Sequence, residues 1–273
     1  MINRGPTNMD RPRLLAREKD ELVPPGVFDR HEGLTESMRR TLMRWLFEVN
    51  ASLKDQGSPE AVQTAAALTD AHFASEVVTR STIQLVGVTA MMIALKLYGH
   101  AVRHCAACDL DTAVYLCDDT YTKEQIRDME WRMLAAHDFA AQRVIPLHLY
   151  CLDVSPNALV DRIARMLMDV GATLVCTRAT RHLPSAIVVA AVELAVLAHA
   201  TDRIDVDREY SELQISMMLA VESMRDSPKG KGIPACHPEA FNDFFAWYRE
   251  EKPSPLKLGQ RRRRARAWCP DIH

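Results

Sequence analysis

The sequence predicts an all-α protein, and three observations support this fold class. Apolar residues recur at steps of three and four along most of the chain, as they do on one face of a helix. The apolar/polar alternation typical of strands is nearly absent, and so are Asn-Gly hairpin turns. Helix-start signals, such as a capping box or a Pro after a Ser, precede several periodic stretches. Two small helical bundles in tandem are therefore expected, joined near Gln142–Pro146.

The first bundle is predicted over residues 35–142, after an N-terminal segment of residues 1–34. Its centre is expected at Ile83–Leu95, which is apolar on nearly all sides and so reads as a buried helix. Amphipathic helices are expected around that centre, with Thr35, Ser58-Pro59 and the Thr122 capping box as start signals. Their expected apolar ranges are Met38–Leu53, Val62–Phe73, Asp109–Leu116 and Ile126–Leu134.

The second bundle is predicted over residues 143–226, and its pattern resembles that of the first. Pro184-Ser185 opens an all-apolar helix over Ala186–Ala198. Amphipathic helices are expected at Leu159–Val170, with Ser155-Pro156 as its start, and at Tyr210–Met224. Residues 227–273 then form a linker, an aromatic patch over Phe241–Tyr248 that fits one helix docking back on the body, and a basic tail.

Composition excludes several classes of protein. The chain has 273 residues, 48% of them hydrophobic, which is too apolar for disorder over most of its length. Its most apolar stretch is too short to cross a membrane, and its N-terminus does not read as an export signal. The formal net charge of −2 hides a split, because residues 252–273 carry seven Lys or Arg and one Asp. An acidic body is not expected to bind nucleic acid, which requires clustered basic residues on the folded surface.

No enzyme or metal site is expected. The ten histidines are dispersed, and no phosphate-binding loop or nucleophile motif is present. The seven cysteines are scattered, which favours free thiols in a reducing compartment. Cys105 and Cys108 form a CxxC that could be half of a zinc site, but no second ligand pair accompanies them, so buried thiols are the favoured interpretation. The sequence therefore predicts no catalytic residue, no bound metal and no cofactor.

Several segments resemble the cyclin box, in order along the chain. These segments are MRRTLMRWLFEV at Met38–Val49, LTDAHF at Leu68–Phe73, QLVGVTAMMIALK at Gln84–Lys96, DDTYTKEQI at Asp118–Ile126 and, less specifically, LPS at Leu183–Ser185. The residues of these segments are similar to those of A/B-type cyclins. The resemblance implies a cyclin fold of two tandem five-helix bundles with a short N-terminal helix. The short segment before the box favours a compact, virus-encoded or divergent member.

The resemblance implies a non-catalytic regulatory subunit that binds and activates a cyclin-dependent Ser/Thr kinase as a heterodimer, promotes cell-cycle progression and helps to recruit substrates. Its binding energy would favour the active position of the kinase's mobile helix. Lys96 and Glu130 would supply a donor and an acceptor for that helix's backbone, and Leu85 and Tyr121 would join them at the kinase-binding surface. The alternative is a tandem cyclin-box scaffold that binds transcription proteins or nucleic acid without activating a kinase.

Two further sets of residues follow from the resemblance. Arg39 and Asp70 match an internal ion pair that ties the first two helices to the N-terminal segment. A substrate-docking patch for RxL-type peptides would be formed by Met38, Leu42, Trp45, Glu48 and Gln84, although the same spacing also fits a core stripe. Arg44 stands where A-type cyclins carry Asp, and it would repel basic peptides.

The tail carries two short signals. Ser254 begins a Ser-Pro-Leu-Lys sequence that fits a phosphorylation site for cyclin-dependent kinases. A basic run follows it and is a candidate import signal, so nucleus and cytoplasm are the expected locations. The run consists of Arg261, Arg262, Arg263, Arg264 and Arg266.

Overall fold

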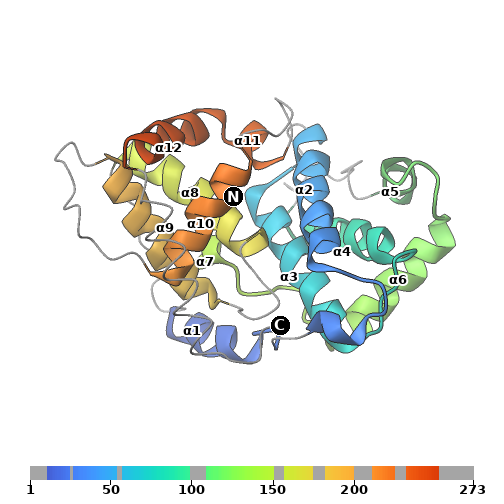
Figure 1. Cartoon of the computed structure of the whole chain (residues 1–273). Coiled ribbons are helices and arrows are strands. Elements are labelled where there is room, and N and C mark those ends of the chain that lie inside the picture. The colour runs from blue at the N-terminus through green and yellow to red at the C-terminus, as the bar shows by residue number, and fades with distance from the viewer. Residues whose placement is uncertain are drawn as a thin grey trace, which may run out of the picture.

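The computed structural model describes residues 11–24, 27–53, 57–98, 109–150, 157–174, 182–199, 211–224 and 232–251. Within these residues the fold is all-α, with no strand, as the sequence predicts. None of their helices is long and apolar enough to cross a membrane. Figure 1 shows two groups of helices side by side, with α1 (Arg11–Asp20) along one edge of the molecule.

The first group is built around α4 (Ile83–Tyr98), whose residues from Leu85 to Leu95 are all buried. This confirms the predicted central helix. Gly87 lets α4 approach α2 closely, because a Cβ at this position would lie 2.6 Å from Leu42 Cδ1. The other helices of the group are α2 (Glu36–Ser52), α3 (Pro59–Ser75), α5 (Leu110–Leu116) and α6 (Lys123–Ala135), together with the short 3-10 helix η2 (Val27–Arg30).

The second group is centred on α8 (Ala158–Thr173) and α9 (Pro184–His199), which pack against each other along their length. A glycine again lies at the contact, since a Cβ on Gly171 would lie 2.7 Å from Ile187 Cγ2. Around this pair pack α7 (Pro146–Tyr150), α10 (Glu212–Ser223) and α12 (Pro238–Glu251), and the short α11 (Ile233–Cys236) joins α12 to α2 and α8.

Most predicted helix starts agree with the structure, and one does not. Thr35, Ser58 and Thr122 accept backbone amides as N-caps, and Thr122 forms the full capping box with Gln125. The start predicted at Ser155-Pro156 is wrong, because α8 begins at Ala158. Asn157 is its N-cap, and its side-chain oxygen accepts the amides of Leu159 and Val160.

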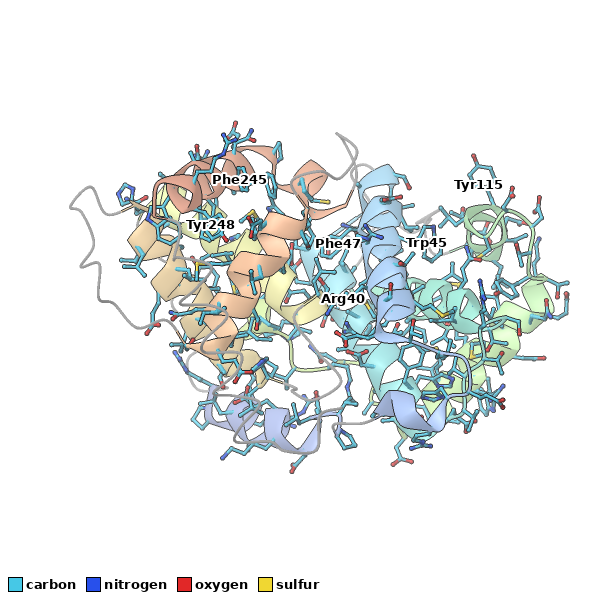
Figure 2. The ribbon with its side chains drawn as sticks, viewed as in Figure 1. Arg40, Trp45, Phe47, Tyr115, Phe245 and Tyr248 are labelled. Carbon is cyan, nitrogen blue, oxygen red and sulfur yellow. The ribbon has the colours of Figure 1, made fainter. Side chains whose placement is uncertain are left out.

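The aromatic patch near the C-terminus docks on the body as one helix, as predicted. In α12, Phe244 and Tyr248 are buried, while Phe241 and Phe245 stack with ring centroids 5.9 Å apart (Phe245 and Tyr248 are labelled in Figure 2). The helix contacts α8, α9 and α10. It therefore covers the second bundle rather than standing apart from it.

Buried polar contacts join the two bundles. Gln63 of α3 donates to Asp169 Oδ1 of α8 at 2.7 Å, and its side-chain oxygen accepts the amide of Leu147 in α7. His237, at the start of α12, lies 2.7 Å from Asp169 Oδ2. Since Gln63 and Asp169 are almost fully buried, these bonds satisfy groups that would otherwise destabilise the interface. The predicted domain boundaries themselves stay predictions.

Candidate functional site

Lys96 and Glu130 meet at the surface where α4 packs against α6. Lys96 lies in the last turn of α4, and its Nζ donates to Glu130 Oε1 at 2.5 Å. The Lys96 side chain is 44% exposed and the Glu130 side chain 17%. The sequence places these residues 34 positions apart, and the packing of the central helix on α6 brings them together. One donor and one acceptor are thus presented side by side at an accessible edge.

Leu85 and Tyr121 occupy a different position. Both are buried, with 6% and 8% of their surfaces exposed. The Tyr121 hydroxyl donates to the carbonyl of Ser81 at 2.6 Å, and burial raises the pKa of Tyr121. In this conformation these two side chains hold the start of α4 in place, and a contact with a kinase through them stays a prediction.

An exposed aromatic pair that the sequence analysis did not single out lies on α6 and just after it. Trp131 and Phe139 are 65% and 57% exposed, and their rings meet edge to face with centroids 5.3 Å apart. Asp138 and Phe139 both have positive φ, 48° and 58°, a conformation that costs energy in residues with a side chain. Aromatic side chains are enriched among binding hot spots, so this exposed pair is a candidate contact for a partner. The missed signal is an aromatic residue directly after Glu130 in the helical pattern.

The predicted docking patch is formed by α2 with the start of α4. Leu42 is buried against Gly87, while Met38, Trp45, Glu48 and Gln84 are half-buried (Trp45 in Figure 2). Leu42 therefore belongs to the core and its neighbours reach the surface, and peptide docking at these residues stays a prediction. Arg44, in the same helix, is exposed and makes no ion pair within the described part of the chain.

Arg39 and Asp70 are buried and joined by two hydrogen bonds. Arg39 Nε and Nη2 donate to the two carboxylate oxygens of Asp70, each at 2.6 Å. Arg39 Nη1 donates to the carbonyl of Thr173 in α8, also at 2.6 Å. The pair therefore links α2 and α3 to the second bundle, and the expected tie to the N-terminal segment stays a prediction.

Other candidates of the sequence analysis lie outside the described residues. These are the CxxC of Cys105 and Cys108, the phosphorylation candidate Ser254 and the basic run after it. Among the residues that the structure describes, no three His, Cys, Asp or Glu side chains converge as metal ligands. Burial raises the pKa of Cys117 to about 12, so this thiol is not activated.

Comparison with known proteins identifies similar sequences over most of this fold. Residues 12–141 match the family model of the cyclin N-terminal domain. The chain is 31% identical over 183 residues to G2/mitotic-specific cyclin-B2 of Anguilla japonica, an alignment covering 66% of this chain and 44% of the relative. It is 31% identical over 201 residues to cyclin-A2 of Bos taurus, covering 71% and 45% of the two chains. The chain thus spans less than half the length of these curated relatives.

A solved structure has the same arrangement of helices. The X-ray structure of a viral cyclin from herpesvirus saimiri superposes with a TM-score of 0.57, over 89% of this chain and 97% of that chain. Sequence identity in the superposition is 13%, so this likeness concerns the fold alone. It extends the similarity from the first bundle, where the family model matches, into the second.

Proposed function

This chain belongs to the cyclin family, and on that premise we propose that it binds and activates a cyclin-dependent Ser/Thr kinase. The observation that carries the proposal is the accessible Lys96–Glu130 pair, which lies within the residues that match the cyclin N-terminal domain. The exposed Trp131–Phe139 pair, which begins one residue after Glu130, is a second candidate contact for the kinase. The chain itself would supply no catalytic group, and the chemistry would belong to the kinase.

The geometry explains how this surface would act on a partner helix. A partly exposed ion pair contributes about 0–1 kcal/mol to stability, so opening it costs little. Once opened, the Lys96 ammonium can donate to the carbonyls at one helix end, and the Glu130 carboxylate can accept backbone amides. Trp131 and Phe139 would bury their exposed rings against apolar side chains of the same helix. Binding would thereby favour one position of that helix over another.

Substrate recruitment would use the surface formed by Met38, Trp45, Glu48 and Gln84. Its half-buried apolar side chains offer contacts to an apolar peptide side chain, and Glu48 is the one acid in this set. Arg44 lies beside them, so peptides rich in Lys and Arg would meet a like charge. Recruitment is therefore expected to be selective among docking peptides.

The test is activation of purified cyclin-dependent kinase subunits, with histone H1 as substrate. We expect the wild-type chain to activate at least one kinase of a panel. The Lys96→Ala/Glu130→Ala double variant should need roughly 30-fold more chain for the same activity, as expected when a hot spot worth about 2 kcal/mol is lost.

Arg162 and Glu239 provide the matched control. They form another exposed ion pair, 2.7 Å long, between α8 and α12 on the second bundle. The Arg162→Ala/Glu239→Ala variant should activate the kinase like the wild type. Equal losses in the two double variants, or no activation by the wild type, would contradict the proposal.

A further inference from the structure

The end of α4 that carries Lys96 is anchored to the second bundle by one side chain. Tyr98 is the last residue of α4, and its hydroxyl lies 3.1 Å from His148 Nε2 in α7, at hydrogen-bond distance. The two rings also contact each other, with centroids 5.8 Å apart. His148 is buried and Tyr98 is half-buried, and this burial raises the pKa of Tyr98 and lowers that of His148.

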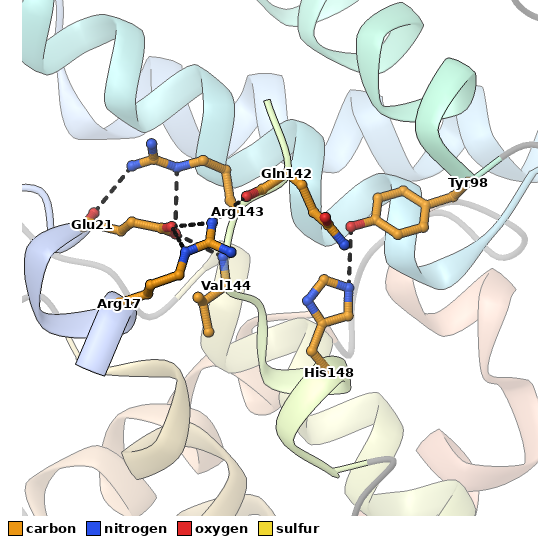
Figure 3. Close-up of polar contacts among 7 residues, drawn as sticks. All are labelled: Arg17, Glu21, Tyr98, Gln142, Arg143, Val144 and His148. Carbon is orange, nitrogen blue, oxygen red and sulfur yellow. Dashed lines mark hydrogen bonds and ion pairs between the residues drawn. The ribbon is translucent and has the colours of Figure 1, made fainter. Parts of the chain in front are cut away.

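The segment between the bundles contacts the same tyrosine. The side chain of Gln142 lies beside the Tyr98 hydroxyl (Figure 3). The backbone carbonyl of Gln142 accepts a hydrogen bond from Arg17 Nη2 of α1 at 2.7 Å. Gln142 therefore touches α1 with its backbone and the end of α4 with its side chain.

Further hydrogen bonds hold the segment between the bundles against α1. Glu21, directly after α1, accepts the amide of Val144 on its carboxylate at 2.7 Å. Arg143 donates to the backbone carbonyl of Glu21 at 3.3 Å (Figure 3). Helix α1 is also bonded to the second bundle, because Glu18 of α1 accepts both the amide and the hydroxyl of Ser185 at the start of α9. The segment that holds Tyr98 is thus itself held by α1.

The last turn of a helix depends on such contacts. Its final carbonyls have no partner within the helix, so an end without tertiary contacts frays at little cost. Lys96 lies in this last turn of α4, and 44% of its side chain is exposed. The order of the turn therefore sets where its ammonium stands relative to Glu130.

We propose that Tyr98 is a positioning residue for Lys96, that His148 ties it to the second bundle and that Gln142 connects it to α1, so that docking of α1 strengthens partner binding at the Lys96–Glu130 surface. This inference rests on the proposed function for the identity of the partner. The connection is energetic, because a frayed helix end must be ordered before the partner binds. Apparent affinity then falls in proportion to the fraction of chains in which the turn is ordered.

The first experiment removes one hydroxyl. Tyr98→Phe keeps the ring but loses the bond to His148. We expect its affinity for the activated kinase subunit to fall roughly 3- to 10-fold, while the rate at saturating chain is unchanged. Tyr248→Phe is the control, since it loses a hydroxyl bond to Glu222 of 3.1 Å on the far helix α12. Affinity losses of equal size in the two variants would overturn the positioning role.

The second experiment tests the link to α1. Arg17→Ala removes the bond to the Gln142 carbonyl. In a double-mutant cycle with Tyr98→Phe, the affinity losses should not add, because both variants release the same helix end. Simple additivity would overturn the connection between α1 and Tyr98.

Hydrogen exchange on the free chain separates this inference from the proposed function. Amides in the last turn of α4 should exchange faster in Tyr98→Phe and in Arg17→Ala than in the wild type. Unchanged exchange in either variant defeats the positioning role whatever the kinase assays give. Faster exchange in a chain that activates no kinase would support the positioning of the helix end and contradict the proposed function alone.

Discussion

Two ion pairs in the first bundle have similar chemistry and opposite surroundings. Arg39–Asp70 and Lys96–Glu130 each join a basic and an acidic residue on two packed helices. The side chains of the first pair are 0% and 8% exposed, and those of the second are 44% and 17% exposed. Arg39 makes three hydrogen bonds of 2.6 Å, whereas Lys96 makes one within the described residues.

The difference separates what holds the fold from what is available to a partner. A buried charge that loses its partner keeps its full cost of desolvation, so the Arg39–Asp70 pair cannot open without damage. An exposed pair exchanges its bonds for water or for a partner at little cost. The Arg39–Asp70 pair therefore stabilises the contact between the bundles. The Lys96–Glu130 pair instead presents an accessible donor and acceptor.

The largest effect is expected from breaking the buried pair. Arg39→Met removes both guanidinium hydrogen bonds from the buried Asp70 carboxylate, which should lower the free energy of unfolding by about 3–5 kcal/mol. Urea denaturation measures this loss. Arg40→Met is the control, because Arg40 pairs with Glu36 on the exposed side of the same helix, and it should lose less than about 1 kcal/mol. A similar small loss in both variants would contradict the assignment of Arg39.

A buried histidine with an unsatisfied ring nitrogen sharpens the comparison. His72 is 1% exposed, and its Nδ1 has no hydrogen-bond partner in the described part of the protein. Burial, with a contribution from Arg132, lowers the pKa of His72 to about 4 from the usual 6.5. His31, Glu76 and His137 are the other ionisable groups that act on it.

The sign of the resulting pH dependence follows from proton uptake. The unfolded chain binds a proton at His72 near pH 6.5, and the folded chain does not until about pH 4. Stability from this group is therefore full above pH 6.5 and is lost as the pH falls toward 4, by about 3 kcal/mol in all. In urea titrations at several pH values, His72→Gln should flatten this slope.

A smaller effect is expected where the core meets the predicted docking patch. Gly87→Ala places a Cβ 2.6 Å from Leu42 Cδ1, so the leucine must move. The cost of overpacking is about 1–3 kcal/mol and is partly offset by the helix propensity of Ala, about 1 kcal/mol. A net loss near 1 kcal/mol in thermal unfolding is expected, and adding Leu42→Ala should relieve the clash. A stabilised Gly87→Ala variant would show that α2 and α4 pack less tightly than described.

The sequence was most informative where the signal is local. The all-apolar stretch at Ile83–Leu95 predicted the buried central helix of the first bundle. The stretch at Ala186–Ala198 predicted α9, although its Val189 and Val196 are exposed. Helix α7 was missed, since five buried residues show no periodicity. The start of α8 was predicted too early in the chain, because Ser155-Pro156 and Asn157 are adjacent helix-start signals. It is the Asn157 side chain that caps the helix.

Contacts between the bundles could not be predicted in the same way. Gln63 and Asp169 are 106 positions apart, and neither belongs to a recognisable pattern. The network of Arg17, Gln142 and Tyr98 depends on how three separate segments meet, which only the packed structure shows. Lys96 and Glu130 were identified through family resemblance, whereas the exposed state of Trp131 required the fold.

The smallest effect on stability is expected at the pair with the largest proposed functional effect. Lys96→Met should change the free energy of unfolding by no more than about 1 kcal/mol, because an exposed pair is weakly stabilising. The remaining difference should vanish near 1 M salt, where charges are screened within about 3 Å. A loss as large as that of Arg39→Met would mean that Lys96 fastens α4 to α6. Lys96, the donor on which kinase binding is proposed to depend, would then be needed for the stability of the fold.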